Sequence, residues 1–390
     1  MSSGNGQFRL LTLHYSLYQL ATALAGGFVG AYLLKLGFGL PAALSAYAGL
    51  LLLRLGLRFG ALAYARRFGF RATLVSGVVL AALQFLPLLR ADSVLWLAVW
   101  ALVLAVAESL YWPVYHAAQA VTGGGARRGR ELGLRTAIGA VIGVIGPLCG
   151  GLLLAHFGPA VDFGIAGFLA LLSALPFLRM EEIPAGPIPG ARESMRGIDR
   201  GALLAFAADG WMASGLLLAW PMVLFVALGA HYEVFGLVNA AAGLVGAGAG
   251  ILCGRAIDRG ERGRYLPAVC LALVAGFVLR AGAGWSPLSA ALANASGAAI
   301  MGLYAPVLMS VIYDRAKHSG AAYRFHFGTE AGWDIGAATG CLVAAAVAAL
   351  SAIPSLAVLP GALGVLVLYA CVRETVPVAA PRAEAPLAAS

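Results

Sequence analysis

The chain has 390 residues, of which 61% are hydrophobic and only 11% charged, and its mean hydropathy is +0.88. Soluble domains carry about 25% charged residues, so the composition excludes a soluble protein and indicates one that lies in lipid. The formal net charge of +9 is divided into short clusters between apolar runs. Such clusters set membrane topology, so we expect no nucleic-acid partner. The five cysteines stand singly, without the spacing of a disulfide framework or a metal site.

A helix that crosses a bilayer needs about 20 mostly apolar residues. Twelve stretches meet this requirement, near 10–34, 41–64, 72–89, 94–120, 133–155, 161–178, 202–228, 234–256, 265–283, 287–312, 324–349 and 353–372. The one long break between them interleaves proline and glycine with charge. We therefore expect an all-α membrane protein of twelve transmembrane helices, divided into an N-terminal half (1–180), a cytoplasmic linker (181–200), a C-terminal half (201–374) and a disordered tail (375–390).

Arginine and lysine residues gather at alternate breaks. If both termini are cytoplasmic, the inner side holds almost all of them, and the outer side keeps Lys35, Arg90 and Arg280. Cytoplasmic loops of membrane proteins carry an excess of these residues. We therefore expect a multi-pass protein of a cell membrane, as in a bacterial cytoplasmic membrane, with both termini in the cytoplasm.

Two loops carry related charged strings. Residues 66–74 read R-R-F-G-F-R-A-T-L and residues 254–259 read G-R-A-I-D-R, with Arg67 and Arg259 separated by 192 positions. Together with the twelve spans, they resemble the two copies of the cytoplasmic signature of the major facilitator superfamily, G-x-L-x-D-R-x-G-R-R-x-x-L. Arg66 stands where the family has its aspartate. The resemblance implies two six-helix bundles (the major facilitator fold) and a conformational latch that comprises Arg67, Gly69, Arg71, Gly254, Asp258 and Arg259.

The fifth span carries closely spaced glycines and a Gly-Pro pair. Such spacing lets another helix approach closely, and proline bends the helix by removing a backbone hydrogen bond. The string resembles the G-x-x-x-G-P-x-x-G-G motif of drug/proton antiporters in the same superfamily, which implies export. The alternative is small-residue packing of a kind common to membrane bundles. The residues are Gly139, Gly143, Gly146, Pro147, Gly150 and Gly151.

Carboxylates inside a span cost roughly 2.5 kcal/mol or more and face a bundle interior or a wet cavity. Glu108 shares a helical face with Tyr111 and Tyr115 by i, i+3, i+7 spacing. We interpret it as a group that takes up and releases protons. The alternative is a structural carboxyl that is bonded to a neighbouring hydroxyl or amide group.

Three further acids lie within predicted spans. Glu330 and Asp334 follow His326 at i+4 and i+8, and Asp209 lies about two turns inside the seventh span. The alternative for His326, Glu330 and Asp334 is that they bond to nearby arginines and form a cytoplasmic gate. We expect proton coupling at Glu108, Glu330, Asp334 and Asp209.

A repeat relates the two halves, because Tyr111-x-Pro113 returns as Tyr304-x-Pro306 after 193 residues. We expect the two tyrosines to face one shared cavity from opposite sides; the alternative is that both are packing features. Arg54 lies deep in its span and needs an acidic partner, for which Glu108 is a candidate. The expected cavity residues are His14, Tyr18, Gln19, Arg54, Tyr111, Tyr115, Trp211, Tyr304, His326 and Trp333.

These features indicate a secondary active transporter that exports a small amphipathic or cationic molecule in exchange for protons, by alternating access. One alternative is a divalent-metal exporter, since His326, Glu330 and Asp209 are ligand types; a second is a non-transporting receptor or scaffold. We expect neither an enzyme nor a cofactor nor a resident metal. The expected partners are protons, a small-molecule substrate and the lipid bilayer, with the protein as a monomer.

Overall fold

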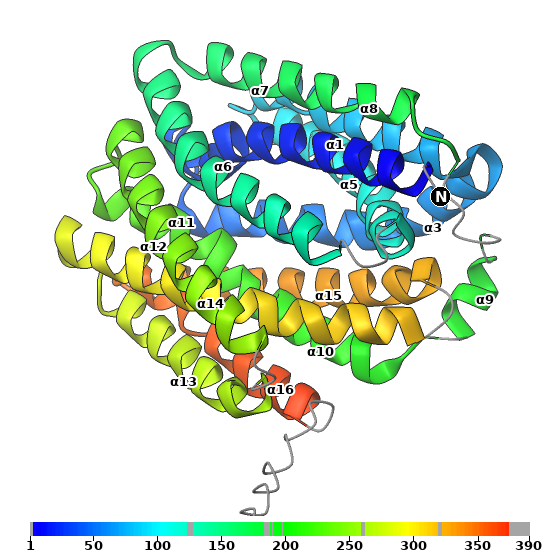
Figure 1. Ribbon diagram of the computed structural model, residues 1–390. Helices are drawn as coiled ribbons and strands as arrows, with labels where there is room; N and C mark the ends of the chain where they lie inside the picture. Colours follow the sequence, from blue (N-terminus) through cyan, green and yellow to red (C-terminus); the bar gives the residue numbers. More distant parts are fainter. Residues whose placement is uncertain are drawn as a thin grey trace, which may run out of the picture.

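The computed structural model describes residues 3–122, 128–182, 188, 190–196, 198–258, 262–318 and 322–373. Within these ranges, the side chains of 3–5, 120–122, 128–133, 136, 253–258, 262–265, 305–318, 322 and 372 are not described. The described residues form long helices that lie roughly side by side (Figure 1). Large apolar side chains are exposed on the outside of this assembly, as on Leu271 (71%), Leu292 (62%) and Leu350 (89%), which is a surface suited to lipid.

The N-terminal half runs from α1 to α8. Its elements are α1 (Ser3–Ala25), η1 (Gly26–Phe28), α2 (Val29–Lys35), α3 (Leu40–Leu83), α4 (Phe85–Leu88), α5 (Val94–Thr122), α6 (Arg128–His156), α7 (Pro159–Ser173) and α8 (Leu175–Leu178). Gly69 interrupts α3 with φ +82° and ψ 173°, a backbone conformation that glycine adopts without steric cost. The element α3 therefore contains two spans, on either side of Gly69.

Among the described residues of the linker, Ala191–Arg196 form the short helix α9. The C-terminal half follows as α10 (Arg200–Ala213), η2 (Ser214–Ala219), α11 (Trp220–Ala227), α12 (Tyr232–Asp258), α13 (Arg262–Ala281), α14 (Pro287–His318), α15 (Ala322–Leu350), η3 (Pro354–Val358) and α16 (Gly361–Arg373). The segment η2 is π-helical, so the seventh span is not a uniform α-helix.

The predicted twelve spans are confirmed by this element order. Nine described stretches are long and apolar enough to cross a membrane, and one of these, Leu40–Leu88, holds the two spans of α3. The shorter apolar helix Leu266–Ala281 within α13 and the 32-residue α14 complete the set. The predicted tail, 375–390, lies outside the described residues.

The two halves meet mainly along three pairs of helices. The helix α12 packs along α6, and α15 packs along α3 and α5. Glycines permit the first contact, because a Cβ at Gly243 would lie 2.6 Å from the carbonyl oxygen of Gly143, and a Cβ at Gly151 would lie 2.6 Å from that of Tyr232. Within the N-terminal half, Gly146 and Gly150 lie against α1. The glycine string of α6 is therefore packed against α1 on one side and α12 on the other.

Candidate functional site

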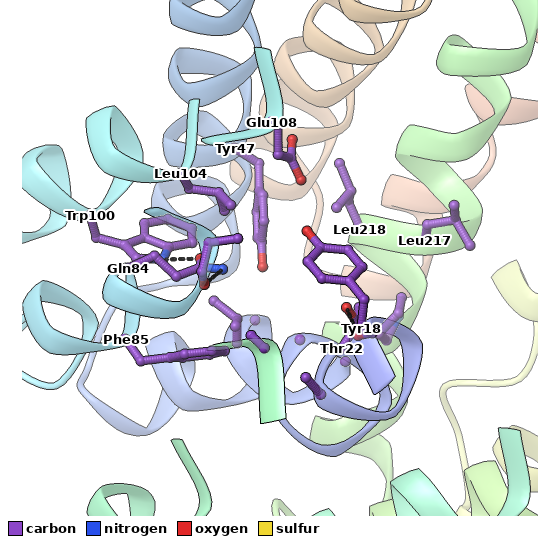
Figure 2. A pocket seen from close by; sticks show the side chains of 18 of the residues that line it. Tyr18, Thr22, Tyr47, Gln84, Phe85, Trp100, Leu104, Glu108, Leu217 and Leu218 are labelled. Carbon is purple, nitrogen blue, oxygen red and sulfur yellow. Dashed lines mark hydrogen bonds between the residues drawn. The ribbon is translucent and has the colours of Figure 1, made fainter. Parts of the chain in front are cut away.

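A cavity of about 370 Å³ lies between the halves, and a second lobe of about 230 Å³ adjoins it, lined mostly by the N-terminal half but also by residues of η2 and α11. The two lobes share six lining residues and therefore adjoin; these are Tyr47, Leu104, Glu108, Trp112, Leu217 and Leu218. The first also touches Leu50, Leu51, Arg54, His116, Phe206, Asp209, His326, Glu330 and Trp333. The second extends to Tyr18, Gln19, Thr22, Gln84 and Trp100, with Tyr18 and Tyr47 on its walls (Figure 2).

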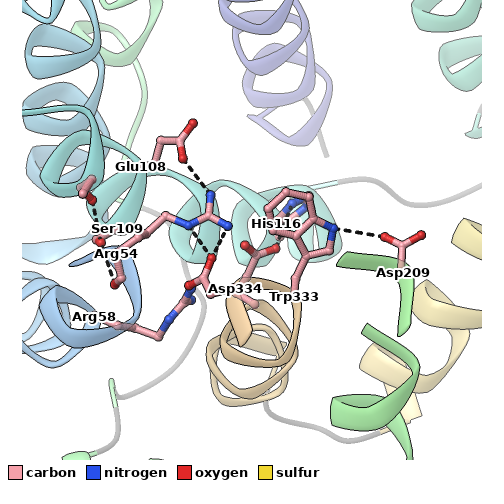
Figure 3. A network of polar contacts seen from close by, with 10 residues as sticks. Arg54, Arg58, Glu108, Ser109, His116, Asp209, Trp333 and Asp334 are labelled. Atoms are coloured by element: carbon pink, nitrogen blue, oxygen red, sulfur yellow. Dashed lines mark hydrogen bonds and ion pairs between the residues drawn. The ribbon is translucent and has the colours of Figure 1, made fainter. Parts of the chain in front are cut away.

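Arg54 is the centre of a polar network on the cavity wall (Figure 3). Its Nη1 donates to Oε2 of Glu108 at 2.7 Å, which joins α3 to α5 within the N-terminal half. Its Nε donates to Oδ1 of Asp334 on α15, in the other half. The side chains of Arg54 and Asp334 are 5% and 0% exposed, while that of Glu108 is 23% exposed. Both Arg54 and Glu108 line the cavity, and Glu108 is the more exposed of the two.

Arg58, one turn after Arg54, also donates to Asp334, through Nη2 to Oδ2. The Asp334 carboxylate therefore lies between two arginines of the opposite half. A buried carboxylate is stable only when it is paired and hydrogen-bonded, and here both partners come from α3. The interface between the halves thus contains a buried ion pair that must break if α3 and α15 separate.

Asp209 on α10 has a different environment, although it lines the same cavity. Its Oδ1 accepts a hydrogen bond from the Tyr304 hydroxyl at 2.8 Å, and its Oδ2 accepts one from Nε1 of Trp333 at 3.2 Å. Both donors are neutral, so these bonds leave the charge of the carboxylate uncompensated. The guanidinium of Arg54 also lies over the Trp333 ring, with Cζ 5.0 Å from the ring centre. Trp333 therefore contacts both Asp209 and Arg54.

Two histidines connect α5 to α15 at the cavity. The rings of His116 and His326 stack with centroids 5.2 Å apart, and Nε2 of His116 lies 3.6 Å from Oε1 of Glu330. The Trp112 ring also stacks on His116, with centroids 5.5 Å apart. The cavity thus brings proton-binding groups from both halves to one wall.

Several predicted cavity residues do not line either lobe, which corrects the sequence-based assignment. His14 is fully buried, with Nδ1 2.7 Å from the Ser173 carbonyl oxygen and Nε2 2.8 Å from the Tyr111 hydroxyl. Tyr115 is 1% exposed and accepts a hydrogen bond from Arg135 at 2.6 Å. Trp211 donates instead to the Pro360 carbonyl oxygen at 2.7 Å, toward α16.

The matched tyrosines, Tyr111 and Tyr304, are each sealed within their own half. Tyr111 is bonded to His14 and Tyr304 to Asp209, and neither is more than 4% exposed. The expectation that both hydroxyls are exposed to a shared cavity is therefore wrong for this structure. The repeat instead places a buried aromatic hydroxyl at a matched position of each half.

The first predicted latch loop has a partner that the sequence analysis missed. Oε1 of Glu182, just after α8, accepts hydrogen bonds from the backbone N–H groups of Phe70 at 2.5 Å and Arg71 at 3.3 Å. The Arg71 side chain donates to the Met180 carbonyl oxygen at 3.1 Å. Glu182 therefore supplies a carboxylate at the loop where Arg66 replaces the aspartate of the signature. The Arg67 guanidinium lies over the Phe68 ring.

The second latch loop cannot be compared in the same way. The side chains of Gly254 and Asp258, and the whole of Arg259, lie outside the described residues.

Among the side chains that the structure does describe, no three of His, Cys, Asp and Glu gather in a cluster that could hold a metal ion.

A family model described as Major Facilitator Superfamily matches residues 11–331. The chain belongs to the Major Facilitator Superfamily. Members of this superfamily are transporters rather than enzymes. Among curated protein sequences, none matches the chain.

Solved structures of superfamily transporters share the fold. A D-xylose–proton symporter superposes with a TM-score of 0.71 at 16% identity, over 97% of this chain and 99% of the other. The E. coli fucose:proton symporter FucP gives 0.64 at 16% identity, over 95% and 99%. The human organic anion transporter MFSD10 gives 0.66 at 15% identity, over 95% and 100%. At these identities the likeness concerns the fold alone.

Missed residues had a signal in the sequence. Tyr47 lies seven residues before Arg54, on the same helical face. Arg58 follows at i+4, but the sequence analysis did not assign it to a partner. His116 lies two turns after Glu108 on the face that meets the cavity. The direction of each face could not be derived from spacing alone.

Proposed function

We propose that this superfamily member is a secondary active transporter that couples proton movement to the passage of a small molecule by alternating access. One observation carries the proposal. The carboxylate of Asp334 is buried between Arg54 and Arg58 of the opposite half, next to the cavity wall that contains Glu108. Rocking of the two halves would separate the ion pair.

Protonation offers a way to release this contact. When one partner of a buried ion pair is lost, the other is left as an uncompensated charge, at about 3–5 kcal/mol. A proton on Asp334 removes its negative charge, and Glu108 remains to hold Arg54. The halves could then part without an isolated aspartate charge in the interface. Glu330 beside His116 would provide a second proton site between the cavity and Asp334.

Charge balance favours a cationic substrate. The cavity network contains Arg54 and Arg58 against the four acids Glu108, Asp209, Glu330 and Asp334. With neutral histidines, two negative charges therefore remain to be balanced by protons or by a bound cation. The rings of Trp112 and Trp333 and the leucines of the wall suit an amphipathic molecule, since aromatic faces attract cations.

We further propose that transport is outward, with both termini cytoplasmic and the protein a monomer. The support for export is the resemblance of the α6 glycine string to that of drug/proton antiporters. The printed names of two structural neighbours describe proton symporters of sugars. Sugar import with a proton is therefore the competing function.

The test uses purified protein in liposomes with an imposed pH gradient. Tetraphenylphosphonium, an amphipathic cation, and D-xylose, a neutral sugar, serve as probes. We expect proton-driven movement of tetraphenylphosphonium against its gradient, and its loss in Asp334→Asn. Proton-driven xylose uptake with no movement of the cation would overturn export of a cationic molecule and favour symport.

A further inference from the structure

Arg280 is a buried cation for which the structure shows no counter-charge. It lies in the last turn of α13 and is 5% exposed. Its guanidinium lies 5.4 Å from the centre of the Trp220 ring. The Nε atom has no hydrogen-bond partner, and no described carboxylate lies within ion-pair distance.

Among the side chains that the structure describes, the elements packed against Arg280 contain no acid; the side chain of Asp314, near the end of α14, is not described. The helix α13 packs against α14, α16 and η3, and neither 262–313 nor 354–373 contains aspartate or glutamate. Glu233, at the start of α12, is 46% exposed and lies 3.8 Å from His231. An arginine stays protonated in proteins, so the charge persists in this environment.

The neighbouring polar side chains are bonded to one another instead. Nε1 of Trp220 donates to Oδ1 of Asn294 at 2.9 Å, and Nδ2 of Asn294 donates to Oδ1 of Asn239 at 3.3 Å. The Nη2 atom of Arg280 lies directly against Gly297 of α14, where a Cβ would collide with it. Glycine at 297 therefore makes the room that the guanidinium occupies.

We propose that Arg280 binds an oxyanion of the phosphate type between α13 and α14. A guanidinium presents a planar fork of N–H donors that matches two oxygens of a phosphate or carboxylate, and a buried cation without an anion is costly. The loop after α13 carries Trp285, which is 77% exposed, and tryptophan is enriched where the membrane meets water. The phosphate group can therefore come from a lipid head group or from free phosphate.

This site is separate from the proposed transport site. Arg280, Trp220 and Gly297 do not line either lobe of the cavity. The proposal for this site therefore does not depend on proton coupling, and its test requires no transport measurement.

The test measures thermal unfolding of the purified full chain in detergent, with inorganic phosphate titrated against sodium chloride at equal ionic strength. A second arm compares bilayer discs of phosphatidylglycerol with discs of monogalactosyldiacylglycerol, which has no phosphate. The variants are Arg280→Gln, Gly297→Ala and, as a control, Arg90→Gln, which removes an exposed arginine. Gly297→Ala displaces the guanidinium while the charge is kept. It therefore tests phosphate binding at this position even if Arg280→Gln does not fold.

At phosphate about tenfold above its Kd, we expect the folded-to-unfolded ratio of the wild type to rise about tenfold. The rise should persist in Arg90→Gln and vanish in Arg280→Gln and Gly297→Ala. Stabilisation by phosphatidylglycerol alone, with the same dependence on Arg280, identifies the lipid as the source. The proposal is overturned if neither form of phosphate stabilises the wild type, or if the two site variants respond as the wild type does.

Discussion

Asp334 and Arg54 lie 280 positions apart in the chain, yet they form a buried ion pair that ties α15 to α3. The side chain of Asp334 is fully buried, and Arg58 bonds its second oxygen. The same carboxylate thus serves as a contact between the halves and as a group whose charge a proton would remove. This double role makes Asp334 the residue at which stability and transport can be measured together.

Asp334→Asn should destabilise the protein, because it leaves Arg54 and Arg58 with one carboxylate fewer in a buried interface. We expect a loss of about 3–5 kcal/mol, measured by thermal or denaturant unfolding in detergent. Asp162→Asn is the matched control. Asp162 is also fully buried, but its carboxylate oxygens have no hydrogen-bond partner among the described groups, so its replacement should cost little. Equal destabilisation of both variants would contradict the ion-pair argument.

Glu182→Ala should weaken the turn between the two spans of α3. Glu182 accepts hydrogen bonds from the first backbone N–H groups after Gly69, in the manner of a helix N-cap, whose loss costs about 0.5–2 kcal/mol. The neighbouring Glu181 is an exposed acid and provides the control, Glu181→Ala. If the loop also acts as a latch, Glu182→Ala should change the labelling of a cysteine placed beside it, whereas the control should not. The same labelling in both variants would leave Glu182 with a structural role only.

Tyr304→Phe and Tyr111→Phe separate a role at the cavity from one in packing. Removal of the Tyr304 hydroxyl leaves Oδ1 of Asp209 without its donor, at about 1–3 kcal/mol, in a carboxylate that lines the cavity. Tyr111→Phe disturbs only its bond to His14. We therefore expect slower proton-driven flux in liposomes for Tyr304→Phe and normal flux, with some loss of stability, for Tyr111→Phe. The reverse order of effects would refute this assignment.

The sequence predicted the spans because a membrane helix needs one continuous apolar run, which is a local property of the chain. It also identified Glu108 as a candidate partner for Arg54, since both are costly in lipid and lie in the same half. The sequence did not predict the pairing of Arg54 with Asp334. That contact depends on how two separately folded halves pack, and no local pattern specifies their register.

The errors at His14, Tyr111 and Tyr115 have another cause. Helical spacing correctly put the two tyrosines on one face, but it did not say whether that face meets the cavity or the interior of the half. The structure turns it toward α1, where Tyr111 meets His14. A small rotation of a helix therefore separates a cavity residue from a buried one, and the apolar pattern of a membrane helix constrains this rotation weakly.

The last prediction concerns Trp333, which makes two contacts of different chemistry. Its N–H donates to Asp209 at 3.2 Å, and its ring lies 5.0 Å from the guanidinium of Arg54. Trp333→Phe keeps an aromatic face under Arg54 but removes the donor, whereas Trp333→Leu removes both. The cation–π contact is worth about 0.5–2 kcal/mol, so stability should fall modestly in the first variant and further in the second. If Asp209 binds the cationic substrate, Trp333→Phe should already alter the affinity for tetraphenylphosphonium, measured by equilibrium binding. Unchanged affinity in Trp333→Phe, with a loss in Trp333→Leu, would instead assign recognition to the aromatic ring and not to the orientation of Asp209.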